Sequence, residues 1–128
     1  MTDDQFLLRF EAHALDEFSH RDHIRLAFAY ARRGGVAAAV DGARGIRAFA
    51  EAHGLPRKYH ETMTVAWARV VGRLAVDSAP LPFGEFLHAN PQLLRPGVLS
   101  PHYSDALLHS ERARASFVEP DLAPLPAA

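Results

Sequence analysis

Apolar residues recur at the spacing of an α-helix through most of the chain, and this pattern constrains the fold more than any other feature. In residues 20–33, 36–53 and 58–77 the apolar positions fall three or four residues apart, which places them on one face of a helix. Few segments show the alternation of apolar and polar residues that a half-buried strand requires. The sequence therefore predicts an all-α fold.

Start and stop signals divide the helical pattern into about five to six helices. Ser19 is a typical N-cap, and Asp22, three residues later, completes a capping box with aspartate in place of glutamate. Gly34 and Gly35 end the helix that Ser19 begins. Ser104 is expected to cap the last helix. The predicted helices cover residues 4–15, 20–33, 36–53, 58–77, 83–89 and 104–117.

The length and the short connections suit a single domain. A chain of 128 residues buries enough surface for one hydrophobic core. Short loops between helices of this length favour an antiparallel bundle. We therefore expect one helical domain over residues 1–119, followed by a loose tail rich in proline and alanine over residues 120–128.

Composition excludes several classes of function. The chain has no cysteine, which removes disulfides, thiolate metal sites and a cysteine nucleophile. Its net charge of −1 gives no basic surface for nucleic acid. It lacks a signal-peptide pattern and has no apolar run of about 18 residues that would span a membrane. We expect a cytoplasmic protein, with the alanine-rich second helix as a face for a homodimer.

Two of the eight histidines lie in the first turn of the helix that begins after Ser19. His20 and His23 are three residues apart, so both side chains project from the same helix face. Ala27 and Tyr30 continue that face, which indicates that it is turned inward. A pair at this spacing can grip one metal ion, as paired ligands do in metal-binding bundles.

A second polar cluster begins the helix predicted over residues 58–77. His60 opens an apolar stripe that Thr64 and Trp67 continue, and Tyr59 and Glu61 flank it. Polar residues at the inward end of a helix cost stability unless they are paired. This departure from the apolar pattern indicates a functional site, and we expect the two clusters to converge there.

Three segments carry a resemblance to a known group of proteins. They read F-S-H-R-D-H at residues 18–23, K-Y-H-E-T at residues 58–62 and S-E-R-A-R-A-S-F-V-E-P-D at residues 110–121. With them the chain resembles a group of small bacterial helical proteins that have no established activity. The resemblance covers nearly the whole chain and implies a shared site without implying a reaction. His102 stands where that group is expected to carry a tyrosine.

These residues lead to the hypothesis of a small metal-dependent enzyme, a lyase or hydrolase that acts on a small molecule. His20, His23 and His60 would hold one divalent transition metal ion, with zinc, iron, nickel or copper suiting three imidazoles. Glu61 would act as general base, and Tyr59 and Thr64 would orient water or substrate.

Two other hypotheses fit the same residues. In a cofactor-free acid–base enzyme, His60 and Glu61 would be the base and its partner, with His20 or His23 as the acid. In a non-catalytic module, the histidines would bind a small ligand or a metal. Each histidine also has a structural interpretation, in which it bonds to the backbone at a helix start or is held within the core. The roles of Trp67, His102 and Arg112 stay open.

Overall fold

The computed structural model describes residues 1–127; within that range it is helical and contains no β-strand, which confirms the predicted all-α class. Ala128 lies outside the described residues. Turns of 3-10 helix occupy Pro56–Lys58 and Pro91–Leu94. The helices are α1 (Asp3–Glu11), α2 (His20–Arg44), α3 (Ile46–Ala52), α4 (Glu61–Asp77), α5 (Phe83–Ala89), α6 (Asp105–Leu108) and α7 (Glu111–Ala115).

The helix α2 starts and breaks where the sequence predicts. The Ser19 side chain accepts a hydrogen bond from the Asp22 amide, and the Asp22 carboxylate accepts one from the Ser19 amide. Gly34 and Gly35 leave the helical conformation inside α2, and Gly35 has a φ of 81°. A side chain at Gly35 would be strained at that φ, so this glycine permits the change of direction within α2.

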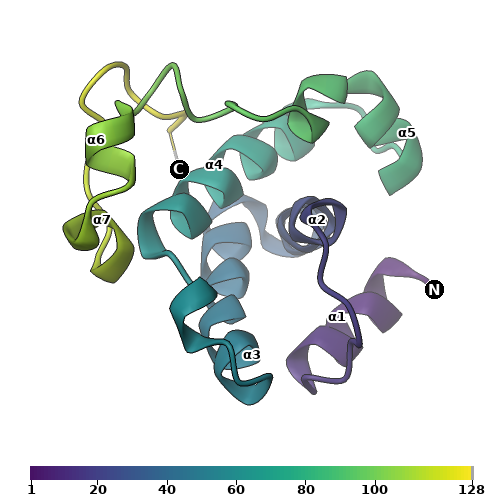
Figure 1. Cartoon of the computed structure of the whole chain (residues 1–128). Helices are drawn as coiled ribbons and strands as arrows, with labels where there is room; N and C mark the ends of the chain where they lie inside the picture. Colours follow the sequence, from purple (N-terminus) through teal and green to yellow (C-terminus); the bar gives the residue numbers. More distant parts are fainter. Residues whose placement is uncertain (128) are drawn as a thin grey trace.

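The pair α2 and α4 forms the centre of the molecule. Figure 1 shows the first part of α2 nearly end-on, with α4 crossing beside it. Gly72 of α4 lies against α2 so closely that a Cβ there would come within 3.2 Å of the Ala39 Cβ and 3.4 Å of the Val36 Cα. The close approach seals the main hydrophobic core, whose fully buried members include Leu7, Ile24, Leu26, Phe28, Val71, Phe86 and Leu93.

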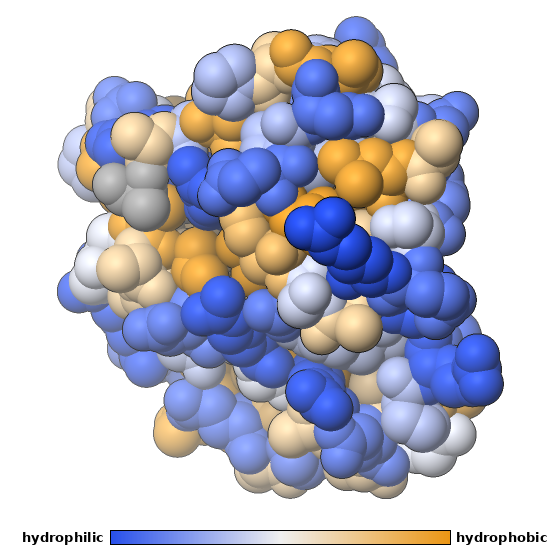
Figure 2. Space-filling view, turned by 90° about the vertical axis from the view of Figure 1, so that its left-hand side faces the viewer, coloured by the Kyte–Doolittle hydropathy of each residue, from blue (hydrophilic) through white to orange (hydrophobic). Residues whose placement is uncertain are grey.

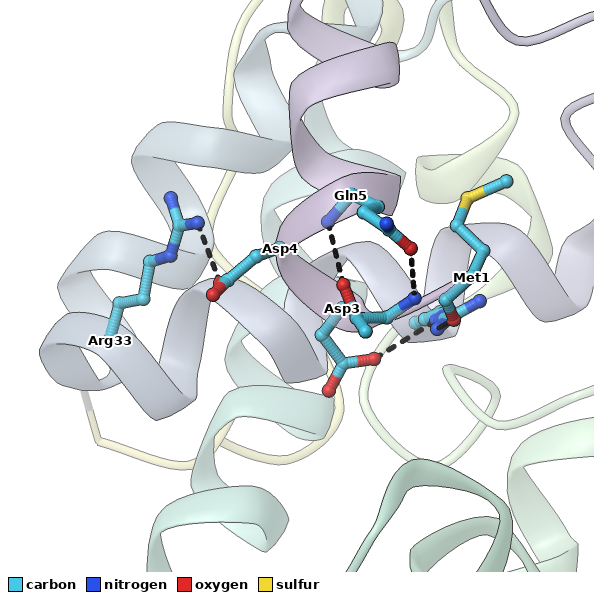
Figure 3. A network of polar contacts seen from close by, with 7 residues as sticks. Met1, Asp3, Asp4, Gln5 and Arg33 are labelled. Carbon is cyan, nitrogen blue, oxygen red and sulfur yellow. Dashed lines mark hydrogen bonds and ion pairs between the residues drawn. The ribbon is translucent and has the colours of Figure 1, made fainter.

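The helix α1 is fixed to α2 by polar contacts at its first turn. Arg25 donates to Asp3 at 3.1 Å, and Arg33 pairs with Asp4 at 2.9 Å. Thr2 and Gln5 form a capping box that begins α1 (Figure 3). The helix ends at Glu11, earlier than the predicted residue 15, and an irregular connection that begins with a turn leads into Ser19.

A second, smaller core joins the C-terminal part to α4. It contains the buried residues Ala66, Leu99, Tyr103, Leu108, Ala113, Val118 and Leu125, with Trp67 and Val70 packed against both cores. The single helix predicted over 104–117 is divided into α6 and α7, because the Ser110 side chain accepts from the Ala113 amide and caps a new helix.

The tail is held in place, which differs from the loose segment that the sequence led us to expect. Arg69 of α4 donates two hydrogen bonds to the Pro126 carbonyl, at 2.7 and 3.1 Å. Asp121 accepts from the amide and the hydroxyl of Ser104, and Leu125 is 7% exposed. Leu125 of the tail therefore belongs to the smaller core, and Pro126 is tied to α4.

The outer face of this part is mixed in character. Figure 2 shows the side that carries α6, α7 and the tail, where apolar patches are separated by hydrophilic side chains. None of the helices described combines the length and the apolar character needed to cross a bilayer. The antiparallel packing, the cytoplasmic location and the homodimer stay predictions.

Candidate functional site

A pocket of about 320 Å³ lies between the start of α2 and the start of α4. Its walls contain five of the six residues that the sequence marked as a site: His20, His23, Tyr59, His60 and Thr64. The two clusters thus converge on one pocket. The other wall residues are mainly apolar and come from α2, α3, α4 and the 3-10 turn before α4: Ala27, Ala43, Ile46, Lys58, Met63, Trp67 and Ala68.

His20 is anchored through one ring nitrogen. Its Nε2–H donates to the Leu93 carbonyl at 2.9 Å. The edge of its ring meets Trp67, with ring centroids 4.9 Å apart and planes at 79°. In the neutral imidazole this tautomer leaves Nδ1 as an acceptor, and Nδ1 has no hydrogen-bond partner within residues 1–127.

His23 has the reverse arrangement. Its Nδ1–H donates to the Ser19 carbonyl at 2.8 Å, which fixes the ring and leaves Nε2 as an unshared acceptor. Phe18 lies 4.2 Å from the imidazole, centroid to centroid. His23 remains exposed as a whole residue, but the neighbouring walls desolvate its ring and lower its pKa below 6.5. The bond to Ser19 opposes part of this lowering. His23 is therefore a neutral base at physiological pH.

His60 is occupied at both ring nitrogens. It is the N-cap of α4, where Nδ1 accepts from the Met63 amide at 3.1 Å. Its Nε2–H donates to the Leu108 carbonyl of α6 at 2.7 Å. The side chain is 6% exposed, and burial lowers the pKa of His60, with the nearby Arg114 acting in the same direction. His60 thus joins α4 to α6 as a neutral imidazole.

This occupancy bears on the predicted three-histidine metal site. A metal ion binds through the free lone pair of a neutral imidazole, and His60 already uses that lone pair for the Met63 amide. In the part of the chain that the structure describes, no group of three or more His, Asp or Glu side chains is arranged to hold a metal ion. The predicted set therefore lacks a third available ligand, although His20 and His23 each keep one free nitrogen.

Glu61 takes part in a polar chain behind the pocket wall. One carboxylate oxygen accepts a hydrogen bond from the Tyr59 hydroxyl, and the other lies 3.1 Å from Arg44 Nε. Burial of the ring, and then the bond to Glu61, raise the pKa of Tyr59 far above its ordinary value. Thr64 opposes part of this rise. Tyr59 is consequently a neutral phenol whose proton is directed to Glu61.

Three contributors to the site were not singled out from the sequence. Arg44, at the end of α2, orients Glu61 from 17 residues away. The Leu93 carbonyl holds His20 from a distance of 73 residues. Lys58 is the only lysine or arginine that lines the pocket in the part of the chain that the structure describes. The first two act across long sequence separations, so no local pattern identifies them. Lys58 was visible in the K-Y-H-E-T segment, where its charge could have been noted.

The other polar residues considered in the sequence lie outside the pocket. Asp22 is a capping residue, as predicted. Thr62 is fully buried; its hydroxyl donates to the Ser116 carbonyl at 3.0 Å and accepts from the Val118 amide at 3.1 Å. His102 donates to the Ala123 carbonyl, and Arg112 is exposed. None of these four lines the pocket.

Comparisons with known proteins return no match: no protein-family model fits the chain, and neither a curated protein nor a solved structure resembles it significantly. The chemistry of the pocket is therefore inferred from its own geometry.

Proposed function

We propose that the pocket binds a small molecule and that His23 acts on it as a general base. The supporting observation is the fixed tautomer of His23, whose Nδ1–H is held by the Ser19 carbonyl while Nε2 keeps a free lone pair at the pocket wall. Its lowered pKa keeps the ring unprotonated at neutral pH. A general base must be positioned, neutral and accessible, and His23 meets these three conditions.

The neighbouring polar groups suit the orientation of a substrate. Because Glu61 holds the Tyr59 proton, the phenol oxygen offers lone pairs to a donor group on the substrate. The Thr64 hydroxyl lines the same wall and can donate or accept. His23 Nε2 then takes a proton either from the substrate itself or from a water molecule that attacks it. The corresponding reactions are a lyase step and a hydrolytic step.

The test uses chelator-treated protein and a mixture of small molecules, with consumption followed by mass spectrometry. We expect His23→Gln to slow turnover at least about 100-fold, the usual contribution of a positioned base. The matched control is His109→Gln, because His109 donates Nδ1–H to the carbonyl four residues back, as His23 does, but lies outside the pocket. Equal loss in both variants would contradict the proposal.

The pH profile adds a second readout. Since the base form of His23 is the active one, the rate in the wild type should rise with pH through the lowered pKa of His23 and then level off. His109→Gln should keep this limb. A profile with no dependence on a group titrating below 6.5 would argue against His23 as the base.

A metal-dependent function is the second candidate, supported by one specific observation. His20 and His23 each donate one ring N–H to a backbone carbonyl and keep the other nitrogen free; metal-ligating histidines are commonly oriented in this way. Water or substrate would complete the coordination. Metal analysis after chelator-free purification should then give near one equivalent for the wild type and none for His20→Gln or His23→Gln. Full activity after chelation would exclude this candidate.

A further inference from the structure

A second hollow adjoins the pocket along the wall formed by His23 and Tyr59. Its volume is about 240 Å³. It shares four lining residues with the pocket: His23, Ile46, Lys58 and Tyr59. The pocket alone lies at the lower end of the range of about 300–1,000 Å³ that is typical of small-molecule sites, and the second hollow extends it. The shared wall carries the proposed general base, so a molecule spanning both hollows passes the reactive nitrogen.

The second hollow is built for a flat apolar group. Phe49 and His53 stack within its lining, with ring centroids 4.2 Å apart and planes at 22°. Phe18 lies 5.1 Å from Phe49 and 4.2 Å from His23, measured between centroids. Leu55 and Ala50 add aliphatic surface. Aromatic walls at these separations favour a further aromatic ring, which gains both buried area and edge or stacking contacts.

Charge at the shared wall indicates the second part of the ligand. Among residues 1–127, Lys58 is the only lysine or arginine that lines either hollow. No hydrogen bond or ion pair engages its side chain among residues 1–127. Asp16 borders the second hollow and disfavours an anion there. An anionic group is therefore expected at the shared wall, beside Lys58, with an apolar ring beyond it.

We propose that the two hollows form one groove for an aromatic carboxylic acid, with its ring in the second hollow against Phe18, Phe49 and His53 and its carboxylate beside Lys58. The assignment of this acid as a substrate rests on the proposed function of His23, but the binding itself does not. The aliphatic link between ring and carboxylate lies against Ile46, on the wall that both hollows share.

Trp67 provides a direct readout of binding. It is the only tryptophan of the chain and it lines the pocket, so its fluorescence reports ligand there. The full-length protein is titrated with hydrocinnamate, with the neutral hydrocinnamamide and with hexanoate, which lacks a ring. We expect saturable binding of hydrocinnamate, and binding at least about fivefold weaker for both comparison compounds, because each lacks one of the two recognised groups.

Two pairs of variants locate the ligand. Lys58→Met should weaken hydrocinnamate about fivefold and leave the amide unchanged, whereas Arg57→Met, an exposed neighbour that lines neither hollow, should change neither. Ala50→Phe fills the second hollow and should abolish binding, whereas Ala52→Phe, at the exposed end of the same helix, should not. Ala50→Leu, a smaller change, is the second variant if circular dichroism shows Ala50→Phe to be unfolded.

The outcomes separate this proposal from the function of His23. Equal binding of acid and amide, or a Lys58→Met protein that binds as the wild type does, overturns the proposed contact between the carboxylate and Lys58. Unchanged binding in both Ala50 variants overturns the ring position, and no saturable signal with hydrocinnamate overturns the groove. Hydrocinnamate bound as proposed but turned over equally by wild type and His23→Gln refutes the general base alone.

Discussion

The helices α2 and α4 both begin at a histidine-containing polar cluster, but they use their histidines differently. At the start of α2, Ser19 and Asp22 cap the helix, so the capping role is filled before the histidines are reached. At the start of α4, the N-cap is His60 itself. His23 therefore keeps a free Nε2 at the pocket wall, whereas His60 has none.

The comparison shows that a histidine becomes available for chemistry when another residue satisfies the backbone around it. The first amides of a helix need acceptors, and a short hydroxyl or carboxylate side chain supplies them most readily. Where such a residue is absent, as before α4, the imidazole is drawn into the cap. The two clusters are equally polar in the sequence, but they differ in the structure. The first forms an open wall of the pocket, whereas His60 of the second joins α4 to α6.

The largest expected effect is the loss of folding stability when His60 no longer joins α4 to α6. His60→Ala removes the acceptor for the Met63 amide, at about 1 kcal/mol, and leaves the buried Leu108 carbonyl unpaired, at about 1–3 kcal/mol. We therefore expect a loss of about 3 kcal/mol in the free energy of unfolding, measured with urea. His23→Ala, on the exposed side, should cost about 0.5 kcal/mol or less.

His60→Asn is the control for this prediction. Asparagine is a favoured N-cap, so its side chain should recover the bond to the Met63 amide while losing the contact with the Leu108 carbonyl. The loss for His60→Asn should lie between those of wild type and His60→Ala. Equal destabilisation by His23→Ala and His60→Ala would contradict the contrast between the two helix starts.

The next effect is on chemical reactivity. Diethyl pyrocarbonate acylates the free nitrogen of a neutral imidazole. His23 offers such a nitrogen at an exposed position, whereas His60 is buried with both nitrogens bonded. Peptide mapping under native conditions should show His23 labelled at least about ten times faster, the ratio that a 1.4 kcal/mol barrier difference produces. Unequal native rates that become equal only after unfolding would support the contrast, whereas equal native rates would refute it.

A smaller effect concerns the cap that frees His23. Ser19→Ala removes one acceptor of the capping box and should destabilise the protein by about 1 kcal/mol. Ser110→Ala, which removes the equivalent cap of the short α7, is the matched variant. If the contrast holds, Ser19→Ala lowers urea stability and leaves the protection of His60 against diethyl pyrocarbonate intact. Exposure of His60 in this variant would mean that the two helix starts are coupled.

The smallest effect is the pH dependence that His60 contributes. Its pKa is lower in the folded protein than the ordinary value of 6.5. Between these two pKa values, the unfolded chain therefore binds more protons than the folded protein does. The stabilisation is therefore complete above about pH 6.5 and is lost as the pH falls toward the folded pKa. Arg114 and His109 face the ring and oppose its protonation. Below pH 6.5, the midpoint temperature of thermal unfolding should fall less steeply with decreasing pH in His60→Asn than in the wild type.

Much of the framework could be predicted from local patterns. The all-α class, the break at Gly34 and Gly35 and the capping box of Ser19 follow from spacing and end signals within a few residues. The same kind of reasoning marked the residues that line the pocket, because inward polar positions on two helices stand out against an apolar pattern. Local rules act between near neighbours, which is why they held here.

The errors occurred where partners come from far along the chain. The role of His60 as a cap was missed because histidine is not a favoured N-cap and because its second partner, Leu108, is 48 residues away. The tail was expected to be loose because its composition is rich in proline, yet its carbonyl at Pro126 meets Arg69 across 57 residues. Backbone acceptors of this kind leave no trace in the side-chain pattern.

The pairing of Thr62 with the segment after α7 has a consequence for the order of synthesis. Val118, whose amide completes that pairing, lies 56 residues beyond Thr62. During translation, the two walls of the pocket leave the ribosome well before the segment 116–118 that pairs with the buried Thr62 hydroxyl. A nascent chain halted before Ser116 would thus carry its complete set of pocket side chains while the Thr62 hydroxyl still lacked its two backbone partners.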